Sequence, residues 1–591
     1  MPTNPPNGAK PPSLEKRLPI ALGLMMLVLL ASQYFFKPAP GPKPAKPVNE
    51  TAVAKLATPP PSASATQNPI PATAAAAAGQ AAPNQITPGQ IGPGQIQASS
   101  EQTTQVDTDL YHIVFTNRGA TIKSWVLKKY KDEAGKPLQV INELAFSKQA
   151  GNDLPQPFSI AIKDRKLSFD PNSVLYQATA SADGSGVDYQ YSDGKTAIHK
   201  SFHFGKNTYL ADVKSSVTEG TNLVPHFLEW RGGFGDPKAF RAASTEHTVH
   251  YDAGASKLIT KNPKDAKNGP ITESGTFTFA GLEDNFFAAV ALPRDNSSAE
   301  ARTYSDDLKV PGEEKPVAYV GSGISTGAQN DFSLFVGPKD IDLLRKVNPK
   351  LGQLIDWGYF SLLAKPIFLW LNWTNDHWTN NYGWAIIVVT IIISVALFPL
   401  RLSSLKSARK MQRLQPQIKA INDRFKNIKI NDPRKAEQNQ EVMALYKKEG
   451  VNPVGGCLPM IIQLPFLYAF YRVLSIAIEL RHAPWLWVSD LSAPESLPIH
   501  LLPIILIITQ FLTQKMTPQA GVDPNQQKMM MFMPLIFGFM FYSFPSGLVL
   551  YYLTSNLVGI VQQVIINRSM PTPAPAVAPV AKAPVKKTVK K

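Results

Sequence analysis

The chain has 591 residues, a formal net charge of +16 and one cysteine, Cys457. This length exceeds that of a single compact domain, so we expect at least two units. One cysteine excludes an intramolecular disulfide, and any domain outside the cytoplasm must therefore be stabilised by its core alone.

An apolar run, residues 18–36, follows two basic residues near the amino terminus. A cleaved signal peptide is one interpretation, but Leu29–Ala31 is a poor cleavage triplet and the apolar run continues beyond it. An uncleaved anchor, preceded by a cytoplasmic segment at 1–17, is the favoured interpretation. Residues 37–104 are rich in Pro, Ala and Gln, which predicts a disordered linker.

Residues 105–347 are predicted to form an antiparallel β-sandwich domain. Apolar and polar residues alternate in runs such as Leu110–Asn117 and Thr276–Leu282, and Gly, Asn and Asp separate the runs. A helical period is expected only at the end of this region, over Lys339–Val347.

Two short patterns in this region resemble functional motifs. Gly194–Thr196 matches the end of a phosphate loop, but Tyr189 occupies the first glycine position and a strand–loop–helix frame is missing. His199 and His203 would lie ~13 Å apart along a strand. We therefore expect surface or internally hydrogen-bonded histidines rather than a metal site.

The region from 351 to the end is predicted to be helical and membrane-associated. Residues 351–371, rich in Trp, Tyr and Phe, suit a helix at the membrane interface. Five apolar stretches in the 384–566 core then read as spans, and with the first anchor they give six crossings and two termini on one side. These stretches are Trp384–Leu400, Val454–Ile478, Ile499–Thr513, Met529–Phe544 and Gly547–Ile566.

Positive charge is concentrated on one predicted side of these spans. Thirteen Lys or Arg against five Asp or Glu lie between Arg401 and Gly450, and five Lys lie in the 567–591 tail. The apolar spacing over 402–450 predicts a helical hairpin. A solvated cytoplasmic face explains the charge through the positive-inside rule, while contact with a ribosome or with anionic lipid is the alternative.

Several polar residues interrupt the apolar spans. Tyr552, Asn556 and Gln563 share a helix face, as do Thr390 and Ser394, and Gln463 and Gln510 add two further spans. Each residue alone could form a hydrogen bond between helices. As a set on four spans, they favour a shared hydrophilic cavity, because polar groups at membrane depth are costly.

At these positions the sequence resembles the YidC family of membrane protein insertases, in its Gram-negative form. The matching text includes "KKEGVNPVGGCLPMIIQLPF" and "FPSGLVLYYLTSNLVGIVQQ" within some 215 residues. The resemblance implies a periplasmic β-supersandwich and a five-helix insertase core whose groove opens to the cytoplasm and the lipid. It also implies that nascent membrane proteins are the substrates and that apolar segments leave along spans three and five.

The resemblance implies no ATP, metal or other cofactor, and no catalytic residue is expected. The implied partners are the Sec translocon and nascent chains, with the ribosome and anionic lipids as candidates and DNA excluded. Within the family, substrate-contacting groove residues map to Thr390, Gln463, Tyr551, Tyr552 and Asn556.

One position departs from the family pattern. Members commonly carry an Arg four residues after the position that matches Thr390, but Ser394 stands there. Arg401 lies seven residues further, ~20° from two full turns, and so remains on the Ser394 face. We expect Arg401 to supply the positive potential of the groove. Arg472 should face away, near Glu479.

The complete set of expected groove residues combines the polar positions in the spans with the positions that the family resemblance implies. It comprises Thr390, Ser394, Arg401, Gln463, Gln510, Tyr551, Tyr552, Asn556 and Gln563. A transporter or channel is the alternative function, but it would predict inverted repeats and an intramembrane carboxylate. A membrane-anchored periplasmic binding or sugar-processing protein would leave the polar spans unexplained.

Overall fold

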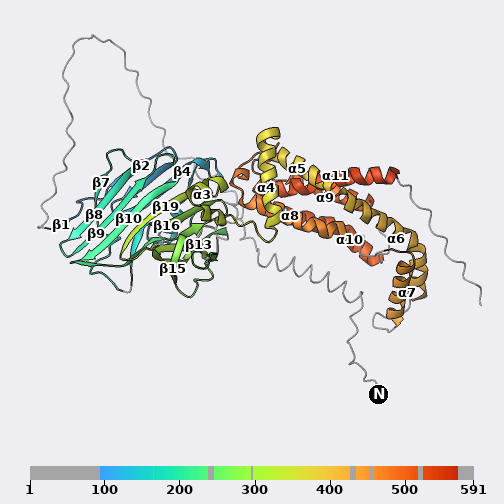
Figure 1. Ribbon diagram of the computed structural model, residues 1–591, viewed down its shortest axis with the longest axis horizontal. Coiled ribbons are helices and arrows are strands. Elements are labelled where there is room, and N and C mark those ends of the chain that lie inside the picture. Colours follow the sequence, from blue (N-terminus) through green and yellow to red (C-terminus); the bar gives the residue numbers. More distant parts are fainter. Residues whose placement is uncertain are drawn as a thin grey trace, which may run out of the picture. The chain divides into compact units, whose positions relative to one another are not determined.

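The computed structural model describes residues 94–163, 165–236, 245–294, 297–425, 434–451, 458–516 and 524–569. They form two compact units, a β unit up to Asp284 and over Ala288–Gly337, and a helical unit made of Asn285–Phe287 and the residues from Pro338 onward (Figure 1). The expected first anchor, the linker up to residue 93 and the tail from residue 570 lie outside the described residues.

The strand pairs whose register the described residues give are antiparallel, among them β1–β8, β9–β10, β10–β19, β12–β18, β2–β3, β3–β4 and β8–β9. A 15-stranded sheet has the main order β1-β8-β9-β10-β19-β16-β15-β17-β18-β12-β6, and a four-stranded sheet has the order β2-β3-β4-β5. Two short 3₁₀ helices, η1 (Glu143–Phe146) and η2 (Lys148–Ala150), follow β5.

The strands are β1 (Gln95–Ile96), β2 (Thr103–Asp107), β3 (Tyr111–Thr116), β4 (Thr121–Lys131), β5 (Pro137–Gln139), β6 (Ser159–Ile162), β7 (Gln177–Ala180), β8 (Gly186–Asp193), β9 (Thr196–Phe204), β10 (Leu210–Glu219), β11 (Asn222–Leu223), β12 (His226–Trp230), β13 (His247–Asp252), β14 (Lys257–Lys261), β15 (Ile271–Glu283), β16 (Phe287–Pro293), β17 (Ser298–Leu308), β18 (Val317–Ser325) and β19 (Gln329–Pro338).

Aromatic side chains fill the core between these strands. Trp125 is buried and packs edge-on against Tyr111, with the ring centroids 5.4 Å apart, and against Phe204 at 5.7 Å. Such edge-to-face pairs stabilise a core beyond the area they bury. The alternation of residues along each strand places these rings inward, which agrees with the β-rich fold expected from the sequence.

Lys200 on β9 is a charged side chain in this core, and its exposed fraction is 0%. Its Nζ donates to the carbonyl oxygens of Gly119 at 2.7 Å, Ala120 at 3.2 Å and Phe158 at 2.7 Å. Burial lowers the pKa of this amine to about 7, because the charged form loses water. The three carbonyls supply the partners that a buried amine requires.

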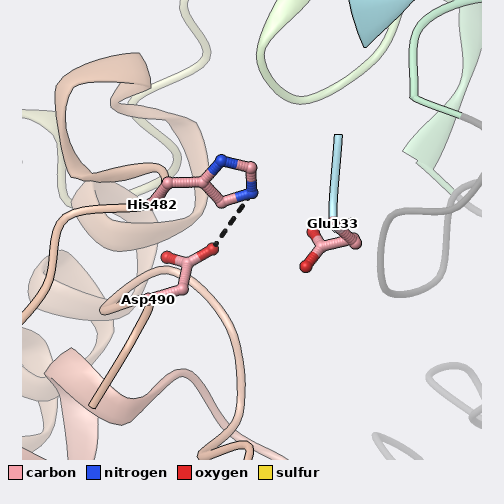
Figure 2. Close-up of side chains that lie close together, drawn as sticks. All are labelled: Glu133, His482 and Asp490. Atoms are coloured by element: carbon pink, nitrogen blue, oxygen red, sulfur yellow. Dashed lines mark ion pairs between the residues drawn. The ribbon is translucent and has the colours of Figure 1, made fainter. Parts of the chain in front are cut away.

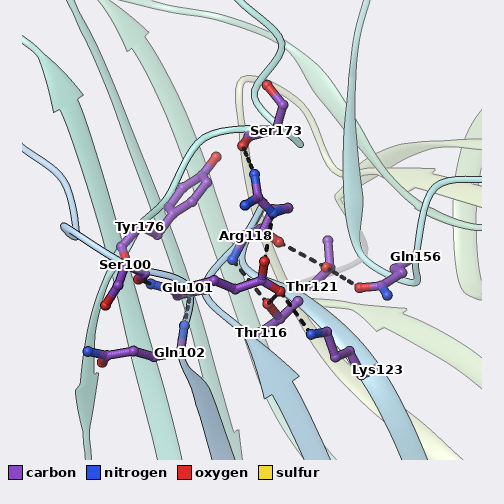
Figure 3. A network of polar contacts seen from close by, with 11 residues as sticks. Ser100, Glu101, Gln102, Thr116, Arg118, Thr121, Lys123, Gln156, Ser173 and Tyr176 are labelled. Carbon is purple, nitrogen blue, oxygen red and sulfur yellow. Dashed lines mark hydrogen bonds and ion pairs between the residues drawn. The ribbon is translucent and has the colours of Figure 1, made fainter.

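The β unit begins before residue 105, the boundary expected from the sequence. β1 pairs with β8, and the Asn117 side chain accepts from the Gln102 amide and donates to the Ser100 carbonyl. Glu101 pairs with Lys123 at 2.9 Å and Arg118 at 3.0 Å (Figure 3). Composition alone could not reveal this boundary, because polar side chains fix these residues to the sheet.

The helical unit contains α3 (Ile341–Val347), η4 (Pro349–Leu354), α4 (Ser361–Thr374), the π-helical η5 (Asn375–Thr379), α5 (Tyr382–Ala396), α6 (Phe398–Arg424), α7 (Arg434–Lys448), α8 (Leu458–Ile476), η7 (Ile478–Leu480), α9 (Leu501–Met516), α10 (Pro524–Phe541) and α11 (Ser546–Ser569). Its apolar core is built mainly from α4, α5, α8, α9 and α11, and includes Phe368, Val389, Phe470, Leu506 and Leu550.

The expected interfacial helix begins ten residues later than the 351–371 range. Residues 349–354 form η4, and α4 begins at Ser361. Before α4, Asp356 pairs with Arg472 of α8 at 2.8 Å, so Arg472 has a partner other than the expected Glu479. Spacing along α8 could not predict this pair, because Asp356 lies on another segment more than a hundred residues away.

The amino-terminal end of α11 is anchored by the segment between α8 and α9. The Ser546 amide donates to the Ala493 carbonyl at 2.8 Å, and the Gly547 amide donates to the Leu491 carbonyl at 2.9 Å. A Cβ at Gly547 would lie 3.0 Å from that carbonyl oxygen, so glycine permits the approach. In the same segment, His482 lies 3.9 Å from Asp490 (Figure 2).

α6 and α7 pack together as the expected helical hairpin. Met411, Leu414 and Ile418 of α6 are buried with Tyr446 of α7 and the following Val451. Arg424 also pairs with Glu441 across the two helices. The pairing thus follows the apolar spacing from which it was predicted.

Length and hydropathy identify fewer spans in the described residues than the six expected. α11 alone is long and apolar enough to cross a bilayer, and α4 with η5 and α5 passes the same test as a pair bent by 115°. α9 and the Phe532–Phe541 part of α10 are shorter apolar stretches.

Candidate functional site

α11 carries a continuous polar stripe, which we define as Tyr551, Tyr552, Ser555, Asn556, Gly559, Gln562 and Gln563. At 3.6 residues per turn, these positions fall within an arc of roughly 140°. Hydrogen bonds join Ser555, Asn556 and Gln562 of this stripe to three different parts of the helical unit. The stripe is the common element of the candidate site.

The first contact joins α11 to α8. Gln463 Nε2 donates to Ser555 Oγ over 3.1 Å, and Gln463 remains half-buried. Gln463 was expected at the site, whereas its partner Ser555 was not. A serine is common on interhelical surfaces, so its residue type alone gave no functional signal.

The second contact joins α11 to α9. Asn556 Nδ2 donates to Gln510 Oε1 over 2.7 Å, and the Gln510 side chain also hydrogen-bonds Tyr552. The Tyr552 ring stacks on Phe541 of α10, with centroids 5.3 Å apart. Three residues predicted from the sequence therefore meet here, between α9, α10 and α11.

The third contact joins α11 to the α5–α6 junction. Arg401 Nη1 donates to Gln562 Oε1 over 3.3 Å, and Gln562 Nε2 donates to the Ser394 carbonyl over 3.2 Å. Arg401 of α6 and the Ser394 backbone carbonyl of α5 thus approach the same side chain. Because the Ser394 contact is made by the backbone, the shared side-chain face expected from the sequence stays a prediction. Gln562 was not among the expected residues, because helical spacing selected Gln563 on the face of Tyr552 and Asn556, and Gln562 lies ~100° around the helix from Gln563.

The remaining expected residues do not join these three contacts. The Thr390 hydroxyl is buried and donates to the Ile386 carbonyl of its own helix at 2.6 Å. Tyr551 is buried and stacks on Phe470, with centroids 4.1 Å apart. Gln563 Nε2 donates to Asn567 of α11 at 3.0 Å, and Arg409 of α6 also donates to Asn567.

In the β unit, Ser215 and His226 resemble a nucleophile and its base. Ser215 Oγ and His226 Nε2 are 2.7 Å apart, and Asn330 Nδ2 donates to the serine oxygen over 3.1 Å. His226 is 0% exposed and Ser215 is 2% exposed, so a substrate could not reach them. Burial also lowers the pKa of His226 to about 4. The pair is a structural polar network.

The histidines considered earlier as metal ligands share one carboxylate at the surface. His199 Nε2 and His203 Nε2 lie 3.5 Å and 3.7 Å from the two oxygens of Asp188. All three side chains are substantially exposed. The arrangement agrees with the expectation of surface histidines.

Two family models match the chain. Residues 103–370 match the YidC periplasmic domain, and residues 373–573 match the model described as 60Kd inner membrane protein. Together with the β-rich and helical units, these matches define the class as an inner-membrane protein that carries a periplasmic β domain.

Similar proteins specify the family. The chain is 34% identical over 578 residues to a membrane protein insertase YidC from Geotalea daltonii, with 94% of this chain and 100% of the relative covered. It is 35% identical to the YidC of Geobacter sulfurreducens, covering 79% and 86% of the two chains. The chain therefore belongs to the YidC family of membrane protein insertases.

A solved structure of the family is also similar. It is described as an active YidC insertase with the first transmembrane domain resolved, and it has 22% identity and a TM-score of 0.34, covering 80% of this chain and 94% of its own. The family assignment confirms the resemblance found in the sequence. The chain is thus a membrane protein insertase, and its family is one of insertases rather than enzymes.

Proposed function

We propose that this insertase passes polar segments of incoming membrane proteins along the polar stripe of α11, within a hydrophilic groove. The observation that supports the proposal is the set of contacts from α8, α9 and the α5–α6 junction onto one face of that helix. Amide and hydroxyl groups there would replace part of the water that a polar segment loses in the membrane, where each unsatisfied group costs several kcal/mol.

The proposed groove retains the full set of residues expected from the sequence. In this proposal Gln463, Gln510, Tyr552 and Asn556 exchange their hydrogen bonds within the helical unit for bonds to the substrate. Such exchange is inexpensive, because hydrogen bonds between membrane helices average only ~0.6 kcal/mol. Thr390, Ser394, Tyr551 and Gln563 form the surrounding wall of the proposed groove, and Arg401 supplies positive potential at its cytoplasmic mouth.

We further propose a six-span topology, with both termini cytoplasmic and the β domain periplasmic. The concentration of basic residues over 401–450 supports this orientation through the positive-inside rule. On α4 and η5, the exposed side chains Leu362, Trp370, Trp373 and Trp378 suit a helix at the membrane interface. Apolar segments of the substrate then leave between α8 and α10 into lipid.

The wider proposal has three parts. The insertase cooperates with the Sec translocon, it contacts the ribosome through the hairpin and basic tail, and it attracts anionic lipid. The exposed basic side chains of the hairpin support the last two, because they attract polyanions. Cooperation with the Sec translocon is what the sequence resemblance implies. Folding assistance and insertion would then be two uses of one groove.

Site-specific photocrosslinking tests the groove. A photoreactive residue at Gln463 or Tyr552 should crosslink to a stalled nascent membrane protein in the full-length insertase. Leu557, which is 47% exposed and lies on the opposite side of α11, serves as the matched position and should crosslink weakly. An absence of crosslinks from both Gln463 and Tyr552 would refute the groove mechanism.

Two arginine variants test the position of the charge. Arg401→Ala should reduce insertion of substrates with acidic translocated tails by roughly fivefold, because the unpaired cation attracts them. Arg472→Ala should have a smaller effect, since Arg472 already pairs with Asp356. The assignment of the charge to Arg401 is wrong if Arg401→Ala leaves insertion unchanged while Arg472→Ala abolishes it.

A further inference from the structure

Arg401 is held by a neutral side chain rather than by a carboxylate. Its guanidinium donates to the Gln562 amide oxygen over 3.3 Å, and no ion pair of Arg401 is found in the part of the chain that the structure describes. An arginine remains protonated in proteins. The half-buried guanidinium therefore keeps its full positive charge while its direction is restrained.

Gln562 has a fixed orientation because it bridges two different groups. It is 7% exposed, and its amide nitrogen donates to the Ser394 carbonyl over 3.2 Å. Ser394 lies in the last turn of α5, where helix carbonyls lose their usual partners. The Leu397 amide donates to the carbonyls of Ile393 and Val395, and the Ser394 carbonyl accepts from Gln562 instead. Reversing the amide would place its NH₂ against the guanidinium and its oxygen against the carbonyl, and both contacts would be lost.

Gly559, one turn before Gln562 on α11, provides the space for the guanidinium. A Cβ built on Gly559 would lie 2.8 Å from Arg401 Cζ, which is closer than real side chains approach. The guanidinium therefore lies against the α11 backbone, and any larger residue would displace it. Gln562 and Gly559 thus restrain the same group from two neighbouring turns.

Two other arginines of the helical unit are paired with carboxylates, unlike Arg401. Arg472 pairs with the Asp356 carboxylate at 2.8 Å, and Arg424 pairs with Glu441. Both pairs cancel much of the charge. At Arg401 the amide of Gln562 occupies the place where a carboxylate would neutralise the cation.

We infer that Gln562 and Gly559 are positioning residues that hold Arg401 as an unneutralised cation, and that they make insertion selective for substrates with acidic residues in the translocated segment. This inference rests on the proposed groove. The partner chemistry is an acidic, hydrated peptide segment, since carboxylates form the strongest bonds with guanidinium.

The test uses full-length protein reconstituted in liposomes and two substrates, which differ only in acidic or neutral residues in the translocated tail. Gln562→Glu preserves the side-chain shape but pairs Arg401 with a carboxylate. We expect it to lower the ratio of acidic-tail to neutral-tail insertion by roughly fivefold, as neutralising a half-buried charge should. Gly559→Ala should lower the same ratio by displacing the guanidinium.

Asn567→Asp is the matched control, because it introduces the same charge change beside Arg409 on the same helix. It should leave the ratio unchanged. An unchanged ratio in Gln562→Glu, or equal loss for both substrates, would overturn the positioning role and leave the groove proposal intact. If the groove itself is wrong, the unmodified protein will fail the separate crosslinking test at Gln463 and Tyr552.

Discussion

Lys200 in the β unit and Arg401 in the helical unit are both withdrawn from solvent, but they have different partners. Lys200 donates to three carbonyl oxygens and is fully buried. Arg401 donates to one amide oxygen and is half-buried. The β unit surrounds its buried cation with three acceptors, whereas Arg401 has one, and we propose that its remaining donors bind the substrate.

The largest expected change in stability comes from removing the buried cation of the β unit, Lys200. Lys200→Met should lower the free energy of unfolding of the β unit by ~3 kcal/mol or more, because three buried carbonyls lose their donor. Denaturant titration of the full-length protein, with hydrogen exchange read at β9, measures this change. Lys214→Met on β10 is the control and should cost under ~1 kcal/mol, because Lys214 is exposed and its ion pair weak. Equal losses in the two variants would contradict the structural role of Lys200.

The stability of the β unit should depend on pH because of the same residue, Lys200. The folded-state pKa of Lys200 is about 7, below its ordinary value of 10.5, so the unfolded chain binds more protons between these values. The contribution of Lys200 to the free energy of unfolding should therefore rise with pH across this window and fall as pH returns to 7. Denaturant midpoints at about pH 7 and about pH 9 test the sign. A Lys200→Met variant with the same rise as the unmodified protein would exclude Lys200 as its source.

A smaller effect on stability is expected in the helical unit. The paired change Gln510→Leu and Asn556→Leu should alter the free energy of unfolding by about 1 kcal/mol or less, yet lower insertion several-fold. Ser475→Ala is the control, because its hydroxyl donates to the Tyr471 carbonyl of its own helix. Insertion assays beside thermal unfolding separate the two effects. Loss of stability in proportion to activity would show that the amide pair only holds the helices together.

The smallest change in stability is expected from substituting Glu101. Hydrogen bonds from Lys123 and Arg118 lower its pKa from 4.5 to about 2, so its contribution to stability is present above pH 4.5 and is lost as pH falls toward 2. The side chain is 38% exposed, which limits the contribution to under ~1 kcal/mol. Glu101→Gln should remove this acid-dependent loss, as measured by hydrogen exchange at β2. An unchanged acid response would assign it to other carboxylates.

The sequence predicted the elements whose patterns are local. Alternation predicted the β-rich domain, the spacing of Met411, Leu414 and Ile418 predicted the hairpin, and the insertase family was recognisable from the motifs near Pro465 and Gly547. Local patterns could not predict contacts between segments that are distant in the sequence. The Arg472–Asp356 pair and the attachment of Ser100–Gln102 to the β unit belong to that group.

The site shows the same limit at the level of single residues. Helical spacing placed Tyr552, Asn556 and Gln563 on one face, but it could not determine which of two adjacent glutamines meets Arg401. Gln562 makes that contact, while Gln563 bonds to Asn567. Gly559 carried no visible signal, because its importance comes from the guanidinium packed against it.

The two ends of α11 are attached by different kinds of hydrogen bond. Backbone amides of Ser546 and Gly547 donate to the carbonyls of Ala493 and Leu491 at its beginning. Toward its other end, the side chains of Gln562 and Asn567 accept from Arg401 and Arg409 of α6. A backbone donor is removed only by proline, whereas many substitutions remove a side-chain contact. Mutation can therefore alter the attachment near Gln562 residue by residue while the beginning of the helix keeps its own.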